Sequence, residues 1–384
     1  MIWELKPLSE LCLLAVDCVN KTAPVVDYET PFKMIRTTNV KGGFIDLNEV
    51  RYVEEETFNQ WTRRSKPKYG DVILTREAPV GSVGRFTSND ENVFLGQRLF
   101  HYRPDPELLD WQYLAYVLQS DALQSWLHGI AFGATVPHVK VQDAEHLKIP
   151  CPPLDVQQKI GAVLAAHDDL IENNLARIKL LEELAQLTYE QWFVRREFPG
   201  YESVQIDTAT GLPVGWNTMP LNQAVLVNPT TRIDIKGKEA PFIPMTSLSN
   251  TSMLISPIES RVSSGGAKFK NGDTLVARIT PCLENGKTGF VQGLDDDSLV
   301  ATGSTEFIVL RESEKVNRYF VYCLARSSYF RDVSILSMVG SDGRQRVNSH
   351  IYKRMPLAVP SRELMDQFES FVEPMFETIG GCSL

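Results

Sequence analysis

A diverged internal repeat constrains the fold of this chain more than any other feature of its sequence. The segment Gly70–Pro79 (GDVILTREAP) is similar to Gly272–Pro281 (GDTLVARITP), and the offset between them, 272 minus 70, is 202 positions. Further pairs recur in the same order: Trp3–Leu8 with Trp216–Leu221, Tyr113–Leu118 with Tyr319–Leu324, and Pro152 with Pro360. A solenoid unit has only about 20–50 residues. The sequence therefore predicts a duplicated domain.

Between the two copies, the apolar spacing is that of one long helix, from Gln157 to about Trp192. Apolar residues recur there at alternating steps of four and three, which places them on one side of a helix and is typical of a coiled-coil seam. The seam consists of Ile160, Leu164, Ile171, Ile178, Leu181 and Ala185. Helices of globular domains average only about 11–12 residues, so we expect an extended helix that connects the copies.

A second, shorter helix is predicted near the end of the chain. It begins near Arg362, and we expect Pro374 to interrupt it and the pair Gly380-Gly381 to end it. Because it is less than half as long as the first helix, we expect the stretch from Ile178 to Trp192 to stay exposed. Exposed apolar surface of this kind favours self-association or a partner subunit.

These features predict an α+β chain with two duplicated mixed α/β domains, a long coiled-coil-type helix between them, and a shorter C-terminal helix. Short β-rich runs that follow a Gly-Asp turn supply the strands. The predicted boundaries are 1–152 for the first domain, 153–196 for the long helix, 197–215 for a linker rich in Pro and Gly, 216–360 for the second domain, and 361–384 for the C-terminal helix.

Charge and cysteine spacing exclude several classes of protein. The net charge of −9 argues against an indiscriminate nucleic-acid coat, although basic loops can exist on an acidic protein. None of the six cysteines forms a Cys-x-x-Cys pair, which excludes a zinc ribbon and a thioredoxin-type site. The sequence has neither an apolar run of 18 residues nor a signal peptide. We therefore expect no membrane span and a cytoplasmic location.

No set of residues combines an acid, a base and a nucleophile. Gly286-Lys287-Thr288 is similar to the end of a phosphate-binding loop, but Pro281 occupies the position of its first glycine. The sequence contains neither a His-Glu-x-x-His metal motif nor the Asn-Pro-Pro-aromatic signature of amino-methyltransferases. We therefore predict a non-catalytic chain without a metal site or a cofactor of its own.

Basic and amide side chains gather instead at loop positions of both copies. Arginine can bind guanine, and asparagine or glutamine can bind adenine, in the major groove, while lysine and arginine neutralise phosphates. Each residue taken alone could equally be an ordinary solvated loop residue. The candidate DNA-binding residues of the first copy are Arg63, Arg64, Lys68, Arg76, Arg85, Gln97, Arg98, His138 and Lys140. Those of the second copy are Arg261, Lys268, Lys270, Arg278, Lys287, Arg344, Gln345, Arg346 and Asn348.

Taken together, these features make the chain resemble the specificity (S) subunits of type I restriction-modification enzymes. Four features carry the resemblance: the Trp-x-x-x-Pro-Leu openings at Trp3 and Trp216, the Gly-Asp strand starts at Gly70 and Gly272, the segment Ile149–Leu154 leading into the long helix, and the linker Gly211–Trp216. The resemblance implies that each duplicated domain is a target recognition domain for one half of a split double-stranded DNA site. It also implies that the helices space these domains.

The same resemblance implies that catalysis belongs to partner subunits. Methyltransferase (M) subunits would transfer a methyl group from S-adenosylmethionine to adenine, and restriction (R) subunits would use ATP and Mg. The candidate partner-binding residues on the helices are Ile160, Leu164, Ile171, Ile178, Leu181, Trp192 and Phe368. The alternative is a duplicated-domain scaffold that binds protein and has no DNA specificity.

Overall fold

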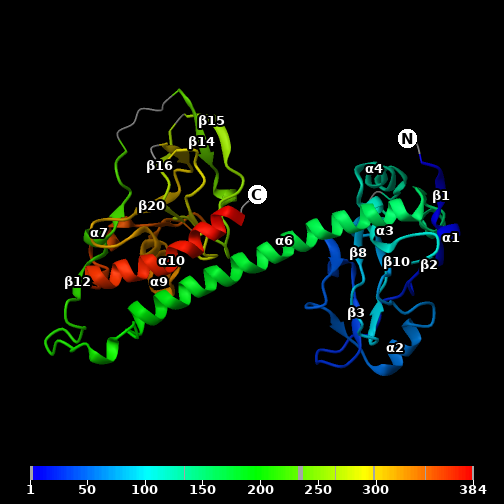
Figure 1. Ribbon diagram of the computed structural model, residues 1–384, viewed down its shortest axis with the longest axis horizontal. Coiled ribbons are helices and arrows are strands. Elements are labelled where there is room, and N and C mark those ends of the chain that lie inside the picture. The colour runs from blue at the N-terminus through cyan, green and yellow to red at the C-terminus, as the bar shows by residue number, and fades with distance from the viewer. Residues whose placement is uncertain are drawn as a thin grey trace. The chain divides into compact units, whose positions relative to one another are not determined.

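The computed structural model describes residues 3–133, 135–231, 237–263, 265–296, 299–341 and 343–382. The chain divides into two compact units, Met1–Ile171 (unit 1) and Glu172–Leu384 (unit 2). The long helix α6 (Leu154–Tyr189) is continuous, as the sequence predicts, and it contributes residues to both units (Figure 1). A π-helical turn, η2 (Glu190–Val194), follows it.

Unit 1 is built on a six-stranded sheet with the strand order β2-β10-β7-β8-β5-β4. These strands are β2 (Cys12–Asp17), β4 (Val40–Lys41), β5 (Gly43–Ile45), β7 (Val72–Arg76), β8 (Val80–Arg85) and β10 (Leu99–Pro104). A smaller sheet has the order β6-β3-β9, with β3 (Lys33–Ile35), β6 (Arg51–Tyr52) and β9 (Val93–Leu95), and β1 (Leu5–Pro7) pairs with β11 (Lys148–Pro150). The helices are α1 (Leu8–Leu11), η1 (Thr37–Asn39), α2 (Glu55–Trp61), α3 (Trp111–Gln119), α4 (Asp121–Ile130) and α5 (Val141–Glu145).

Strand β7 shows why an uninterrupted apolar run forms a strand here. Alternate residues of a strand point to opposite faces of its sheet. Val72 and Leu74 pack in the core that also contains residues of α3, whereas Ile73 packs in a second core with Phe86 and Leu99. Both faces of β7 are therefore covered, which explains why all five of its residues are buried.

Unit 2 repeats this plan. Its main sheet has the order β13-β20-β17-β18, with β13 (Leu226–Val227), β17 (Thr274–Ala277), β18 (Thr288–Phe290) and β20 (Phe307–Arg311). The second sheet has the order β15-β14-β19-β16, with β14 (Glu239–Ile243), β15 (Glu259–Val262), β16 (Ala267–Phe269) and β19 (Ala301–Gly303). Two strand pairs join β12 (Asn217–Pro220) with β23 (Pro356–Val359), and β21 (Met338–Val339) with β22 (Arg346–Val347). The helices are η3 (Tyr201–Ser203), α7 (Leu221–Ala224), η4 (Met245–Ser247), α8 (Arg318–Arg326), α9 (Ser328–Leu336), η5 (Ser349–Lys353) and α10 (Arg362–Cys382).

The two units therefore share one architecture, and the predicted duplicated α+β fold is confirmed. The order β2-β10-β7-β8 corresponds to β13-β20-β17-β18, and the order β6-β3-β9 corresponds to β15-β14-β19. Even the mixed pairing agrees, because β3 runs parallel to β9 just as β14 runs parallel to β19. The boundaries predicted for the domains, helices and linker stay a prediction.

The repeated Gly-Asp pair has the same structural task in both units. Gly70 and Gly272 adopt φ values of 88° and 85°, which glycine tolerates best. The next residue, Asp71, is buried and accepts hydrogen bonds from Nε and Nη2 of Arg103 at 2.9 and 2.7 Å. Asp273 accepts from the same two nitrogens of Arg311 at 2.6 and 2.7 Å. Each turn therefore ties two neighbouring strands of the main sheet together.

The C-terminal helix corrects two expectations. We predicted that Pro374 would interrupt it and that Gly380-Gly381 would end it, but α10 is continuous through both to Cys382. Proline costs a helix about 3 kcal/mol. The apolar side chains that follow, Met375, Phe376 and Ile379, are buried in the core of unit 2, and their burial offsets this cost.

The stretch from Ile178 to Trp192, predicted to be exposed, lies largely in the core of unit 2. Ile178 and Tyr189 are buried there, and the Tyr189 ring lies 5.2 Å from that of Phe320 on α8. The Trp192 ring lies 5.9 Å from that of Phe368 on α10. Figure 1 shows α10 beside the second part of α6 within unit 2. The prediction was wrong because it considered α10 alone as a cover, whereas α8 packs there too.

Unit 1 holds its part of α6 by close packing and hydrogen bonds. Gln157 is buried, accepts from the backbone N of Asp110 at 3.0 Å, and donates to the carbonyl oxygens of Leu108 and Pro152. One turn later, a Cβ at Gly161 would lie 2.7 Å from the carboxylate of Asp110.

Among the described residues, no helix combines the length and the apolar character that crossing a membrane requires.

Candidate nucleic-acid interface

In unit 1, three segments meet at the end of β7, and several predicted residues meet with them. Arg76, the last residue of β7, donates its backbone N–H to the carbonyl of Arg98 at 2.9 Å. Its guanidinium Nη1 donates to the carbonyl of Val139 at 2.7 Å, and the backbone N of Val139 donates back to Arg76 at 3.0 Å. Arg76, Arg98 and His138 thus come from segments far apart in sequence and lie together at the end of the sheet where β7 ends. We call this end of the sheet the edge of the unit.

Side chains at this edge carry both charge and aromatic surface. Glu77 forms an ion pair with Arg98, with 3.3 Å between Oε1 and Nε. The rings of His138 and Phe132 lie 4.0 Å apart, and the ammonium group of Lys140 lies 5.1 Å from the Phe132 ring. Phe132 and Lys140 are exposed, so the edge presents a cation and a ring to solvent.

The corresponding edge of unit 2 uses the same backbone contacts. The backbone N of Arg278 donates to Glu306 at 2.9 Å, the backbone N of Val347 donates to Arg278 at 2.9 Å, and Arg278 Nη2 donates to Val347 at 3.4 Å. These bonds match those of Arg76 with its two partners. They establish that Glu306 occupies the place that Arg98 has in unit 1.

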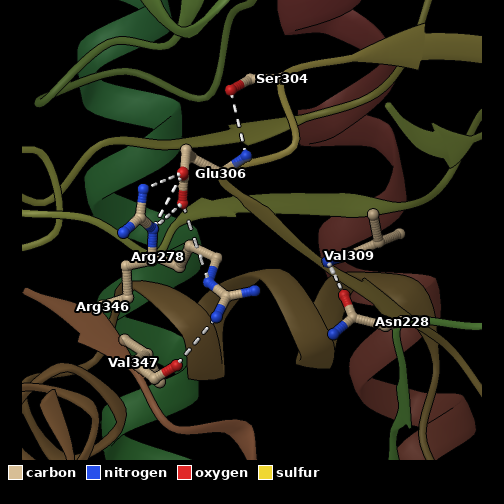
Figure 2. Close-up of polar contacts among 7 residues, drawn as sticks. All are labelled: Asn228, Arg278, Ser304, Glu306, Val309, Arg346 and Val347. Atoms are coloured by element: carbon tan, nitrogen blue, oxygen red, sulfur yellow. Dashed lines mark hydrogen bonds and ion pairs between the residues drawn. The ribbon is translucent and has the colours of Figure 1, made fainter. Parts of the chain in front are cut away.

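Glu306 lies between two predicted DNA-binding arginines (Figure 2). Arg346 donates from Nε to both carboxylate oxygens at 2.9 Å and from Nη2 to Oε1 at 2.7 Å. Arg278 Nε lies 4.0 Å from Oε2. The hydrogen bonds from Arg346 hold the pKa of Glu306 below its ordinary value, so the carboxylate stays charged near neutral pH.

The segment that carries Arg346 also carries three other predicted residues. Arg344 is exposed, and the carbonyl of Gln345 accepts from the backbone N of Thr280 at 3.1 Å. The side chain of Asn348 accepts from the backbone N of His350 and caps η5. Most of the second predicted group therefore lies together at one edge of unit 2.

Other predicted residues of unit 1 lie elsewhere. Arg63, Arg64 and Lys68 are exposed in the connection from α2 to β7, and Arg64 pairs with Asp17. Gln97 accepts a hydrogen bond from Thr22.

Arg85 is buried, with a side chain that is 3% exposed, so it does not face solvent as a DNA-binding residue would. Its Nη2 lies 2.7 Å from Asp168 of α6, and its Nη1 lies 2.6 Å from the hydroxyl oxygen of Tyr116.

The remaining predicted residues of unit 2 lie on other elements. Arg261 on β15 pairs with Glu259 and covers the ring of Phe242, and Lys268 lies on β16. Lys270 is exposed just before the Gly-Asp turn, and Lys287 donates to the carbonyl of Met245 at 3.1 Å.

The prediction from sequence missed the two carboxylates, Glu77 and Glu306. Glu77 directly follows Arg76 and was detectable by its position, but Glu306 lies 40 residues from Arg346 and no local pattern marks it.

Within the described ranges, no group of three or more His, Cys, Asp or Glu side chains is placed to hold a metal ion.

Comparisons with known proteins agree with this geometry. Residues 3–183 match the family model described as type I restriction modification DNA specificity domain. Over 342 residues the chain is 25% identical to the MjaIX specificity subunit of Methanocaldococcus jannaschii, covering 86% of this chain and 76% of the relative. The chain belongs to the specificity subunits of type I restriction-modification enzymes. Specificity subunits determine which DNA sequence the enzyme recognises and are not catalytic, so this subunit is not itself an enzyme.

Two further similarities extend this assignment. The EcoAI specificity subunit of Escherichia coli is 29% identical over 187 residues, which cover 47% of this chain and 31% of that subunit. The crystal structure of a type I S subunit from M. genitalium matches with a TM-score of 0.62 at 15% identity, over 99% of this chain and 91% of that one. The structural match shows a common fold, including sheet-rich domains connected by a long helix.

Proposed function

We propose that this specificity subunit reads a split double-stranded DNA site, with one half of the site read by each unit. The observation that carries the proposal is the equivalent edge in the two units. Arg76, Arg98 and His138 converge at that edge in unit 1, and Arg278 and Arg346 converge there in unit 2. A duplicated fold with a basic edge in each copy suits a site that has two halves.

Two reading units on one chain bind a split site more tightly than either would alone. Binding of the first unit raises the effective concentration of the second at its own half-site. Each unit can then bind weakly by itself, which agrees with the net charge of −9. The spacing role that the family resemblance gives to α6 is part of this proposal.

The catalytic steps would come from partners that dock on the helices. Of the seven predicted partner-binding residues, Leu164 and Ile171 on α6 are exposed, whereas Ile178 and Phe368 are buried and the side chains of Ile160, Leu181 and Trp192 are partly buried. Other exposed apolar residues of α6 are Val163, Leu170, Leu175, Leu180, Leu184 and Leu187. We propose that methyltransferase subunits, which use S-adenosylmethionine, cover this surface. Restriction subunits, which use ATP and Mg, would join them in the cytoplasm.

The proposal is tested by expressing the chain with its neighbouring methyltransferase gene and sequencing the modified bases of the host genome. The expected result is methylation at one motif with two specific halves and a fixed gap. The same host without this chain should show no such motif. A methyltransferase that co-purifies with the chain while the genome stays free of any split motif would favour the protein-binding scaffold instead.

A further inference from the structure

The four arginines at the two equivalent edges differ in what holds their guanidinium groups. Arg76 and Arg278 donate to the backbone carbonyls of Val139 and Val347. Arg76 is only 7% exposed. Arg76 therefore has little surface left for a ligand. The side chain of Arg278 is 34% exposed, but it shares its carboxylate: its Nε lies 4.0 Å from Glu306, which Arg346 contacts more closely.

Arg98 and Arg346 are held by carboxylates instead, and their side chains are 39% and 44% exposed. The Nε side of each guanidinium faces its carboxylate, Glu77 in unit 1 and Glu306 in unit 2. Within the described part of the chain, neither guanidinium has another hydrogen-bond acceptor. In Arg346, one hydrogen of Nη2 is used by Glu306 Oε1. The other Nη2 hydrogen and Nη1 of Arg346, and both Nη atoms of Arg98, remain available to a ligand.

A guanidinium held in this way suits a base better than a phosphate. The terminal edge can donate two parallel hydrogen bonds to O6 and N7 of guanine. The paired carboxylate restricts the side chain before binding, so less rotamer freedom is lost on contact. It also offsets the positive charge that would attract a phosphate, whereas the guanine edge carries no net charge.

The backbone at Arg98 adds an independent observation. Its φ of 73° lies in the left-handed region, which a residue with a Cβ rarely adopts. Strained backbone of this kind concentrates at functional sites.

We propose that Arg98 and Arg346 each read one guanine, in opposite halves of the split site, with Glu77 and Glu306 as the residues that position them. This inference rests on the proposed function and names the base chemistry of that site. The reading arginine lies just before β10 in unit 1 but on β22 in unit 2, because Glu306 takes the place of Arg98.

The first test replaces each arginine with lysine in the complete complex of this chain with its methyltransferase partner. Methylation is measured on a library in which every position of both half-sites is varied. Arg98→Lys keeps the charge but cannot donate two parallel hydrogen bonds from a planar guanidinium group. It should reduce the preference for G·C at one position by roughly tenfold or more and leave the other half unchanged. Arg346→Lys should do the same at one position of the other half. A uniform loss of methylation across all sequences, without a changed preference at any position, would overturn base reading in favour of phosphate contact.

The second test replaces the positioning residues. Glu306→Gln should weaken discrimination at the same base pair as Arg346→Lys, and Glu77→Gln at the same base pair as Arg98→Lys. Such coincidence is not expected from a merely structural role, which would lower methylation at every sequence alike. Asp366→Asn, which removes the carboxylate from an exposed arginine pair on α10, is the matched control and should leave the preferences unchanged.

The wild-type complex separates failure of this inference from failure of the proposed function. If the wild-type library shows no split motif, the proposed function fails. If it shows the motif but the glutamate variants leave every base preference intact, only the positioning role is overturned. Thermal unfolding of each variant beside the wild type confirms that a changed preference does not come from an unfolded unit.

Discussion

At one equivalent position, unit 1 forms an ion pair and unit 2 forms a contact between two aromatic rings. Arg85 is the β8 residue opposite Val72, and Phe290 is the β18 residue opposite Thr274 at the equivalent register. Each contacts the fifteenth residue of the helix that ends its own repeat, counted from Leu154 in α6 and from Arg362 in α10. In unit 1 this contact is the ion pair with Asp168, and in unit 2 the Phe290 ring lies 5.1 Å from that of Phe376.

This comparison teaches that the shared fold requires a contact at this place but not a particular kind of contact. A buried ion pair gains little net stability, because desolvation of the two charges opposes their attraction. An aromatic pair gains from apolar burial and has no such cost. Arg85 and Asp168 also form hydrogen bonds with the hydroxyl group of Tyr116, and Arg85 Nε donates to the carbonyl of Gly43 at 3.3 Å.

The largest effect is expected in unit 2. Phe376→Ala removes a ring that also lies 4.8 Å from Tyr319 and 5.5 Å from Tyr322, and it should cost about 3–5 kcal/mol of unfolding free energy. Urea titration followed by circular dichroism measures this cost. A loss below about 1 kcal/mol would mean that the ring contributes little and that the comparison overstates the aromatic pair.

Breaking the ion pair in unit 1 should have the next largest effect. Asp168→Asn leaves the buried Arg85 without a charged partner and should cost about 2–3 kcal/mol, a value reduced because Asp168 is 29% exposed. Asp169→Asn changes the adjacent, exposed carboxylate and is the control, with an expected change within about 0.5 kcal/mol. Replacing both partners together, Arg85→Met with Asp168→Leu, should recover most of the loss. If the double variant is no more stable than Asp168→Asn, apolar packing cannot substitute here as it does in unit 2.

Gly161 tests whether α6 is held more closely in unit 1 than α10 is held in unit 2. A Cβ at Gly161 would crowd Asp110 and Gln112, whereas the equivalent eighth residue of α10 is Glu369. Gly161→Ala should destabilise unit 1 by about 1–3 kcal/mol through overpacking. Gly129→Ala, in α4 with open space around its Cβ position, should instead stabilise by up to about 1 kcal/mol. Thermal unfolding of both variants decides this, and equal shifts of the same sign would contradict the close approach.

The smallest effect concerns the dependence of stability on pH. Each unit holds a buried carboxyl group, and the pKa values of the two groups are shifted in opposite directions. In unit 1, burial by itself would raise the pKa of Asp71, but hydrogen bonds from His101 and Arg103 outweigh it and lower the pKa. This contribution is complete above the unfolded value of about 3.9 and is lost only as pH falls through the lower folded pKa. In unit 2, burial raises the pKa of Glu182, and bonds from Met253 and Ser252 offset this only in part.

Protonation of Glu182 therefore favours the folded state, and its contribution to unit 2 grows as pH falls from neutral toward the unfolded value of about 4.3. The midpoint of thermal unfolding of the wild type and of Glu182→Gln, measured at pH 7.5 and 5, checks this expectation. The variant should be at least as stable as the wild type at pH 7.5, and this advantage should shrink at pH 5. An advantage that grows at the lower pH would show that the carboxylate is stabilising as an anion.

Much of the fold could be predicted from local patterns. The Gly-Asp turns, the apolar runs and the heptad spacing each depend on neighbours within a few residues, so Gly70, Val72 and the α6 seam were identifiable in the sequence. The failure at Pro374 has a physical cause as well. Local propensity disfavours proline in a helix, but burial of distant aromatic partners around Phe376 outweighs it.

The candidate site was predictable only in part. The sequence identified Arg98 and Arg346 as basic loop residues, but it treated them in the same way as Arg76 and Arg85. Only the fold separates these arginines, because burial and the pairing of distant segments decide whether a guanidinium braces a backbone carbonyl, neutralises Asp168 or faces solvent.

By itself, the sequence determined that this chain holds two related units and one long helix, since periodicity and repetition are properties of the chain alone. The tertiary structure decided which charges are used internally and which remain for a ligand. The physical reason is that a carboxylate acts on an arginine through space, and Glu306 contacts Arg346, 40 positions further along the chain, only after the fold has brought them together.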